Sequence, residues 1–214
     1  MSASLFFDLD GTLTDPRDGI VRSIQYALKE LGRMSPSAAE LTRYIGPPLH
    51  ESFSILLGTS DASRVEQAIA LYRQRFAVEG IFENELYPGI TVALTTLKAR
   101  AHSLFVVTSK PTVFARKIVD HFALQAYFHN VYGSELDGTR ANKAELIAHV
   151  LEQEHIPSND AAMIGDREHD IKGALANAVQ PIGVLWGYGS RAELIQAGAP
   201  VLCETPEALA KHFS

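Results

Sequence analysis

The sequence predicts an α/β fold, in which helices cover both faces of a parallel sheet and an all-helical domain is inserted into this core. Two observations predict it. Short apolar, strand-like runs recur along the chain, and a segment with helical spacing precedes each later run. One long interval near the N-terminus breaks this alternation, because it holds helical patterns and no convincing strand. The 214 residues, of which 46% are hydrophobic, are enough to bury a sizeable core.

The predicted strands are apolar runs at residues 5–7, 104–107, 131–132, 161–164 and 182–185. Apolar residues with helical spacing precede the second run at 92, 94 and 97, and precede the fourth run at 146, 147, 150 and 151. Functional sites of parallel α/β sheets lie beyond the carboxyl ends of the strands. The residues at or just after these ends are Asp8, Thr108, Gly133 and Asp166.

The interval without strands runs from residue 16 to residue 85. Helical patterns at 20–31, 38–45, 49–57 and 65–78 are separated by turn signals at Gly32, Gly46-Pro47-Pro48 and Gly58. We therefore expect a core domain of residues 1–15 and 86–214, and a helical cap domain of residues 16–85.

The composition argues against nucleic-acid binding, an internal disulfide and a membrane span. The net charge is -6 and basic residues are scattered, so we expect no polyanion-binding surface and no nucleic acid polymer as partner. The single cysteine, Cys203, excludes an internal disulfide. No apolar stretch approaches the roughly 18 residues of a membrane span, and the N-terminus lacks a signal-peptide pattern. A cytoplasmic protein, monomeric or homodimeric, is the expectation.

The first strand ends in the motif Asp8-Leu-Asp10-Gly11-Thr12. An aspartate at a strand end, beside a glycine that allows close backbone approach, can attack phosphorus as a nucleophile. A second aspartate two residues later can protonate the leaving oxygen and then activate water. The alternative is that both carboxylates only cap an Asp-Gly turn.

Three further groups follow later strands. Thr108-Ser109-Lys110 precede Pro111, where a helix start would offer a hydroxyl and backbone N–H groups to a phosphate; a plain N-cap is the alternative. Lys143 begins an amphipathic helix and is a candidate site residue. The alternative is an exposed surface lysine. Asp166 and Asp170 follow the fourth strand as oxygen ligands for a hard cation, although helix capping would explain Asp166 alone.

These four pieces, each at a strand end and in this order, resemble the motif set of the haloacid dehalogenase superfamily, which implies a Rossmann-like core of that fold. The resemblance implies that Asp8 is the nucleophile, Asp10 the acid and base, and Lys143 the residue that pairs with nucleophile and phosphate. Gly11, Thr12, Thr108, Ser109 and Lys110 are expected to bind phosphate. Magnesium would be bound by Asp8, Asp166 and the backbone carbonyl of Asp10, with Asp170 acting directly or through water.

The negative charge of the expected site is a second reason to expect a metal ion, besides the family resemblance. Four carboxylates gathered around a phosphate dianion repel one another strongly, so a divalent cation and Lys143 are needed before the site can form. Magnesium suits such an all-oxygen, partly hydrated site. We therefore expect Mg²⁺ as the cofactor.

Asp10 and the insert point to a branch of the superfamily. An acid at this position implies phosphate esters, since it protonates an alkoxide leaving group. The stretch Arg43-Tyr44-Ile45-Gly46-Pro47-Pro48-Leu49 is similar to phosphoglycolate phosphatases and 5′-nucleotidases. Arg43 is a candidate for binding the distal end of the substrate, and the alternative is a solvated helix residue. The expected function is hydrolysis of small phosphate monoesters through an aspartyl-phosphate. The alternatives are a sugar phosphomutase and a phosphometabolite-binding module that has lost turnover.

Overall fold

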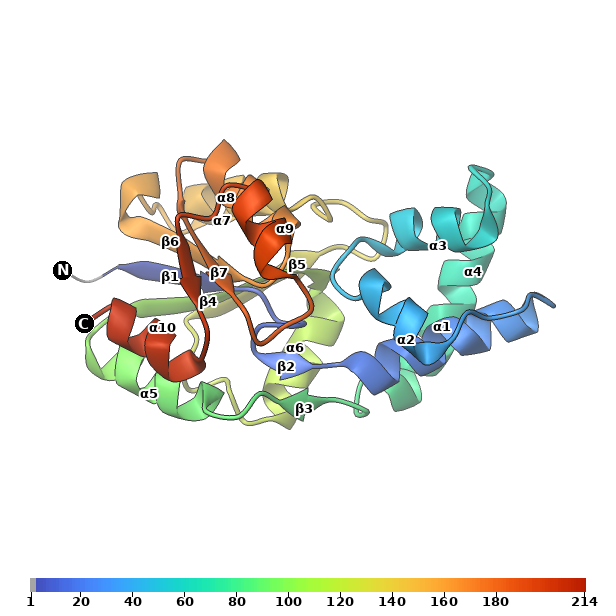
Figure 1. Ribbon diagram of the computed structural model, residues 1–214, viewed down its shortest axis with the longest axis horizontal. Coiled ribbons are helices and arrows are strands. Elements are labelled where there is room, and N and C mark those ends of the chain that lie inside the picture. The colour runs from blue at the N-terminus through green and yellow to red at the C-terminus, as the bar shows by residue number, and fades with distance from the viewer. Residues whose placement is uncertain (1–2) are drawn as a thin grey trace. The chain divides into compact units, whose positions relative to one another are not determined.

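A six-stranded parallel sheet, in the strand order β5-β4-β1-β6-β7-β8, forms the centre of the larger part of the molecule (Figure 1). The computed structural model describes residues 3–214. The strands are β1 (Ser4–Phe7), β4 (Ser103–Pro111), β5 (Asn130–Ser134), β6 (Ala161–Gly165), β7 (Gln180–Val184) and β8 (Val201–Cys203). A separate two-stranded sheet pairs β2 (Thr14–Asp15) with β3 (Glu85–Leu86).

Helices cover both faces of the six-stranded sheet. In Figure 1, α7, α8 and α9 lie on one face, and α5, α6 and α10 lie on the other. Their bounds are α5 (Ile90–Ala99), α6 (Thr112–His121), α7 (Lys143–Gln153), α8 (Glu168–Ala176), α9 (Arg191–Gln196) and α10 (Pro206–His212); a 3₁₀ turn at Ser158–Asp160 precedes β6. The predicted α/β fold class is confirmed.

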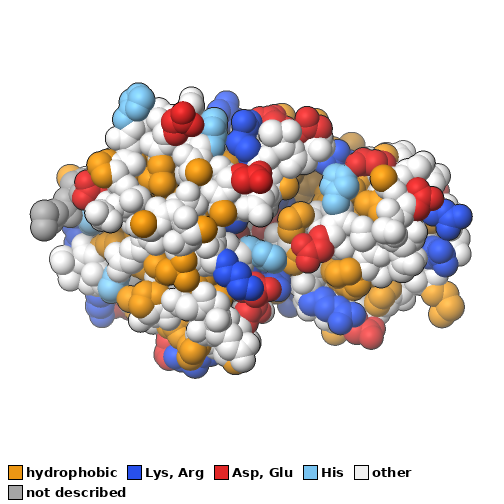
Figure 2. Space-filling model, turned by 90° about the horizontal axis from the view of Figure 1, so that it is seen from above, with side chains coloured by type: hydrophobic (Ala, Val, Ile, Leu, Met, Phe, Trp, Pro, Cys, Tyr) orange, Lys and Arg blue, Asp and Glu red, His pale blue; other side chains and the backbone are white. Residues whose placement is uncertain are grey.

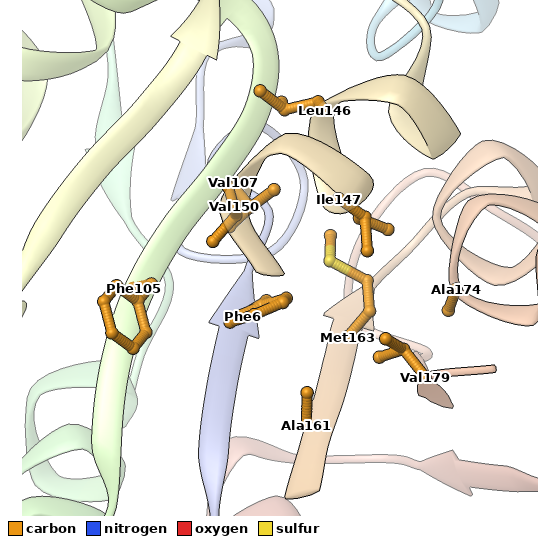
Figure 3. Packing of buried hydrophobic residues seen from close by; sticks show 10 residues of the cluster. All are labelled: Phe6, Phe105, Val107, Leu146, Ile147, Val150, Ala161, Met163, Ala174 and Val179. Carbon is orange, nitrogen blue, oxygen red and sulfur yellow. The ribbon is translucent and has the colours of Figure 1, made fainter. Parts of the chain in front are cut away.

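Strand β1 lies between β4 and β6 and is buried on both faces. Phe7 pairs with Val106 of β4 and with Ile164 of β6 in parallel register. A strand covered on both faces reads as a continuous apolar run, which explains the Leu-Phe-Phe of the sequence. On one face, Phe6 and Met163 pack against apolar side chains of α7 (Figure 3). The end of β1, which Asp8 follows, is therefore held in place by β4 and β6 and by the buried core.

The described residues divide into two compact units. One unit holds the described residues up to Asp15 together with Leu86–Ser214, and the other holds Pro16–Glu85. The second unit consists of α1 (Arg17–Glu30), α2 (Ala38–Leu41), a 3₁₀ turn (Thr42–Tyr44), α3 (Leu49–Leu57), α4 (Ala62–Arg75) and a π-helical turn (Phe76–Gly80). Its core includes Phe53, Tyr72 and Phe76. The ring of Tyr72 contacts the ring of Phe53 and that of Phe76.

Two local predictions differ from the structure. Strand β4 continues through Lys110 to Pro111, so α6 begins at Thr112 and Lys110 does not lie at a helix start. The extension is possible because the pairing of β4 with β5 shifts register between Val107 and Pro111 and resumes at Pro111 and Ser134. The short edge strand β8 has no counterpart among the predicted strands.

Surface charges of both signs are interspersed on the face of the molecule shown in Figure 2. Among residues 3–214, no helix combines the length and the apolar character that crossing a membrane requires.

Candidate active site

The site begins where β1 leaves the sheet. The backbone N–H of Asp8 still donates to the carbonyl oxygen of Ile164, at 2.9 Å, so the main chain of this residue belongs to the sheet. The chain then turns, with Gly11 at a φ of 82°. A side chain at this position would also overlap the carboxylate of Asp166. Both features require glycine, which explains why a glycine follows the two aspartates of the motif.

Lys143, the first residue of α7, joins two of the predicted carboxylates. Its ammonium lies 3.0 Å from Oδ1 of Asp8 and 2.8 Å from Oδ1 of Asp170, and it donates to the carbonyl oxygen of Val107 at 3.0 Å. The side chain of Lys143 is 4% exposed. Burial alone would lower the pKa of this lysine, but the charges of Asp170 and Asp8 raise it above its usual value. Lys143 therefore stays protonated between these acids.

Three carboxylates converge beside Lys143. Asp8, Asp166 and Asp170 are buried, and each offers an oxygen within 4.8 Å of the others. Asp166 accepts from the hydroxyl of Thr12 at 3.3 Å and from the backbone N–H of Tyr188 at 2.8 Å. The Oδ2 atom of Asp170 accepts from the backbone N–H of Arg167 at 3.1 Å. These hydrogen bonds fix the orientation of both later aspartates.

The electrostatics of the triad favour a bound cation. Burial, together with the charges of Asp170 and Asp8, raises the pKa of Asp166 well above its usual value. Burial also raises the pKa of Asp170, although Lys143 opposes this effect. Grouped, buried carboxylate oxygens are the arrangement that a hard divalent cation stabilises. The donor set of Asp8, Asp166 and Asp170 could therefore hold a metal ion.

Asp10 has a different environment from the triad. Its Oδ2 atom lies 2.8 Å from the ammonium of Lys110, and the two side chains are 10% and 6% exposed. Its Oδ1 atom is buried without a hydrogen-bond partner among the described residues. Burial raises the pKa of the Asp10 carboxyl, and the charge of Lys110 opposes this rise. Lys110 thus binds one oxygen of Asp10, and the other oxygen has no partner among the described residues.

The other predicted phosphate ligands lie at the end of β4. The hydroxyl oxygen of Thr108 is buried and accepts from the backbone N–H of Lys110 at 3.3 Å. The carbonyl oxygen of Ser109 accepts from the hydroxyl of Ser134, at 2.9 Å. The strand end is thus held by β5. Thr12, by contrast, uses its hydroxyl on Asp166, so it orients a carboxylate.

Arg43 belongs to the helical unit. Its guanidinium stands 5.2 Å from the centre of the Tyr44 ring, in a cation–π arrangement, and its side chain is exposed. The proposed contact with the distal end of a substrate stays a prediction.

Two further residues contact the site: Tyr188, which the sequence analysis missed, and Trp186, which the sequence only predicts to pack beside it. Tyr188 supplies a backbone N–H to Asp166, and its hydroxyl pairs with the carboxylate of Asp15. Trp186 donates from its indole nitrogen to the carbonyl oxygen of Thr12 at 2.9 Å. The signal was the alternating Trp-Gly-Tyr-Gly after the fifth predicted strand, since such glycines mark a close backbone approach.

Comparisons with known proteins show the family to which the chain belongs. The family model described as haloacid dehalogenase-like hydrolase matches residues 5–184. A 5′-nucleotidase of Pseudomonas aeruginosa is 51% identical over 191 residues, which are 89% of this chain and 86% of that protein. A crystal structure of a predicted phosphatase from Clostridium acetobutylicum superposes with a TM-score of 0.96 at 41% identity, covering 100% of this chain and 99% of that one.

Other relatives carry different names. The tyrosine-protein kinase PtkA of Mycobacterium tuberculosis is 39% identical over 89% of this chain, which spans only 64% of that protein. A phosphoglycolate phosphatase of Aquifex aeolicus is 28% identical, over 86% of this chain and 85% of that protein. The chain therefore belongs to the haloacid dehalogenase-like hydrolases, as its motif set predicted, and it is an enzyme of the phosphoric monoester hydrolase type.

Proposed function

We propose that this enzyme hydrolyses nucleoside 5′-monophosphates through an aspartyl-phosphate formed on Asp8. The observation that carries the proposal is the placement of Asp8. Its carboxylate is buried at the end of the central strand, contacts Lys143 and belongs to the acidic triad. The name of the Pseudomonas aeruginosa relative supports nucleotides over the less similar phosphoglycolate branch.

In the first half-reaction, a carboxylate oxygen of Asp8 attacks phosphorus, and the bond from phosphorus to the ester oxygen breaks. Asp10 gives its proton to that oxygen, so the product leaves as an alcohol. The unpaired Oδ1 atom of Asp10 is the atom suited to this transfer, because Lys110 contacts the other oxygen.

In the second half-reaction, water attacks the phosphorus of the aspartyl-phosphate. Asp10, now ionised, takes the proton of this water, and the bond from phosphorus to the Asp8 oxygen breaks. Inorganic phosphate leaves, and Asp8 and Asp10 return to their starting states. Lys143, Thr108 and Ser109 would bind the phosphoryl oxygens throughout.

Mg²⁺ would be held by Asp8, Asp166 and the backbone carbonyl of Asp10, with Asp170 as a direct or water-mediated ligand. When bound, the ion neutralises negative charge and polarises a phosphoryl oxygen. The ammonium groups of Lys143 and Lys110 offset only part of the charge of the four buried carboxylates. A phosphate dianion could not enter such a site without a further cation.

The partner implied by this chemistry is a small phosphorylated metabolite. We further propose that residues 16–85 act as a cap domain that excludes water during phosphoryl transfer. Arg43 in that unit remains the candidate for recognising the distal part of the substrate.

The test is release of inorganic phosphate from a panel of nucleoside 5′-monophosphates, phosphoglycolate, sugar phosphates and ATP, with Mg²⁺ and with a chelator. ATP belongs in the panel because of the relative named as a kinase. We expect turnover to be concentrated on the nucleotides and lost with the chelator. Turnover concentrated on phosphoglycolate would overturn the substrate class, and interconversion of sugar phosphates would indicate the phosphomutase.

The Asp8→Asn variant tests the nucleophile. It should abolish both hydrolysis and acid-stable labelling of the enzyme from a ³²P-phosphate ester while keeping the melting temperature near that of the wild type. The exposed Asp120 of α6 provides the control, since Asp120→Asn should hydrolyse at the wild-type rate. Unchanged hydrolysis by Asp8→Asn would remove Asp8 from this role.

A further inference from the structure

Glu193, on the short helix α9, contacts the connection between β6 and α8, beside two members of the acidic triad. One of its carboxylate oxygens accepts from the side-chain Nε of Arg167 at 2.8 Å and from the backbone N–H of Glu168 at 3.0 Å. The side chains of Glu193 and Arg167 are 24% and 14% exposed. A partly buried, charge-assisted pair of hydrogen bonds therefore joins α9 to this loop.

The loop consists of Asp166 and Arg167, and Asp170 follows in the first turn of α8. From the inner side, Oδ2 of Asp170 accepts from the backbone N–H of Arg167 at 3.1 Å. From the outer side, Glu193 binds the side chain of Arg167 and the next backbone N–H. The loop is thus held between a triad carboxylate and a carboxylate that does not belong to the triad.

The position of Glu193 is itself fixed. Its backbone N–H donates to the hydroxyl of Ser190, which caps α9, at 3.1 Å. Just before this cap, Gly189 packs so closely against the backbone carbonyl of Asp166 that any side chain there would overlap it. The start of α9 and the backbone of Asp166 therefore lie in direct contact.

Glu193 also binds the cationic side chain of Arg167, next to Asp166 in the sequence. Arg167 is adjacent in sequence to Asp166, and its guanidinium could neutralise the carboxylates that a metal ion needs. The ion pair with Glu193 holds the Nε of Arg167 and satisfies part of its charge. A cation near a metal site weakens metal binding, whereas a restrained ion pair does so much less.

We propose that Glu193 is a positioning residue that sets the divalent-cation affinity of the triad through Arg167 and Glu168, without contacting the ion. This inference rests on the metal site of the proposed function. Residues that orient metal ligands typically change metal affinity by about 10- to 100-fold when they are removed. We expect a loss in this range for Glu193→Ala and a smaller loss for Glu193→Gln, which keeps an acceptor oxygen but not the charge.

The experiment measures Mn²⁺ binding to the metal-free chain by electron paramagnetic resonance, together with its melting temperature in a chelator. The matched control is Glu204→Ala, because Glu204 pairs with Arg191 of the same helix α9 at the same 2.8 Å but is 74% exposed. We expect Glu204→Ala to bind Mn²⁺ like the wild type. A purely structural role of Glu193 would lower the melting temperature and leave Mn²⁺ affinity unchanged, which would overturn the inference.

A further variant, Asp166→Asn, tests the proposed metal site separately from the role of Glu193. If Asp166→Asn loses Mn²⁺ binding while Glu193→Ala binds like the wild type, the inference fails and the proposed metal site stands. If Asp166→Asn also binds like the wild type, both fail. Should Glu193→Ala not fold, Glu193→Gln decides, and wild-type affinity in that variant overturns the inference.

Discussion

Lys110 holds its ammonium 2.8 Å from Oδ2 of Asp10, and both side chains are at least nine-tenths buried. The sequence analysis assigned Lys110 to phosphate binding, but in the structure its ammonium contacts the carboxylate expected to act as acid and base. Since the extension of β4 through Lys110 places this side chain, the pairing of β4 with β5 contributes to the chemistry of Asp10.

Lys110→Met should change the pH dependence of hydrolysis. Burial already raises the pKa of Asp10, and Lys110 is the main opposing influence, so its removal raises that pKa further. The ionised, base form of Asp10 then becomes scarcer at a given pH. The acidic limb of the kcat profile should move to higher pH, with a larger loss of kcat near about pH 6 than near about pH 8.

A kcat profile measured across this range checks the prediction. The exposed Lys117 of α6 provides a control variant, Lys117→Met, whose profile should match that of the wild type. A uniform loss of kcat at every pH would contradict the assigned effect of Lys110 on Asp10.

Gly11→Ala should disturb both the fold and the triad. A non-glycine residue at a φ of 82° costs about 1–2 kcal/mol, and the added Cβ atom would also overlap the carboxylate of Asp166. Gly32→Ala is a matched control, because Gly32 has a φ of 66° and no atom lies within 4 Å of the point that an added Cβ atom would occupy. Denaturant unfolding should show a larger loss for Gly11→Ala, and only that variant should lose hydrolysis. Equal losses in the two variants would refute the overlap.

Lys143→Met should destabilise the metal-free enzyme. It leaves Asp8 and Asp170 buried without their ammonium partner, and breaking a buried ion pair in this way typically costs about 3–5 kcal/mol. The exposed pair of Lys172 and Glu168 gives the control, Lys172→Met, for which about 0.2–0.5 kcal/mol is expected. Urea unfolding in a chelator measures both. A loss for Lys143→Met no larger than the control would show that its ion pairs contribute little.

Glu83→Gln should remove a pH-dependent part of the stability of the helical unit. Arg75 and then Arg22 hold the pKa of Glu83 below its usual value. A carboxyl group whose pKa is lower in the folded chain stabilises the fold above its unfolded pKa of about 4.5, and this contribution is lost as the pH falls through the folded pKa. We expect a loss of about 1–3 kcal/mol near neutral pH that shrinks below about pH 4.5.

Thermal melts of wild type and Glu83→Gln as a function of pH test this expectation. Glu152→Gln, at an exposed position of α7, should follow the wild type at every pH. A difference between Glu83→Gln and wild type that grows as the pH falls would have the wrong sign.

The catalytic candidates were predictable because they follow strand ends. Parallel strands bring their carboxyl ends to one edge of the sheet, so the apolar runs alone implied that Asp8, Thr108 and Asp166 would be neighbours. Asp170 was expected from its spacing after Asp166, whereas Lys143 required the family resemblance, because an isolated lysine at a helix start is common. The structure places both against Asp8.

Contacts formed by single backbone groups were not predictable. The carbonyl of Val107 that accepts from Lys143 has no sequence signature, because every residue carries such a group. The glycines beside Tyr188 indicate a close backbone approach, but they do not show that the N–H of Tyr188 binds Asp166. Glu193 reads in the sequence as one of many charged residues on a short helix. The ion pair of Lys110 with Asp10 depended on a register shift between β4 and β5, which apolar patterning does not reveal.

The hydrogen bond from the backbone of Asp8 to Ile164 has a consequence for how the enzyme loses activity. Central strands of a sheet open only when the whole domain unfolds, whereas loops and edges open locally at lower cost. Amide deuterium exchange at Asp8 should therefore be as slow as at Phe6, although Asp8 lies at the end of its strand. Asp8, the proposed nucleophile, should keep its backbone position until the core unfolds, so loss of activity on heating should coincide with global denaturation.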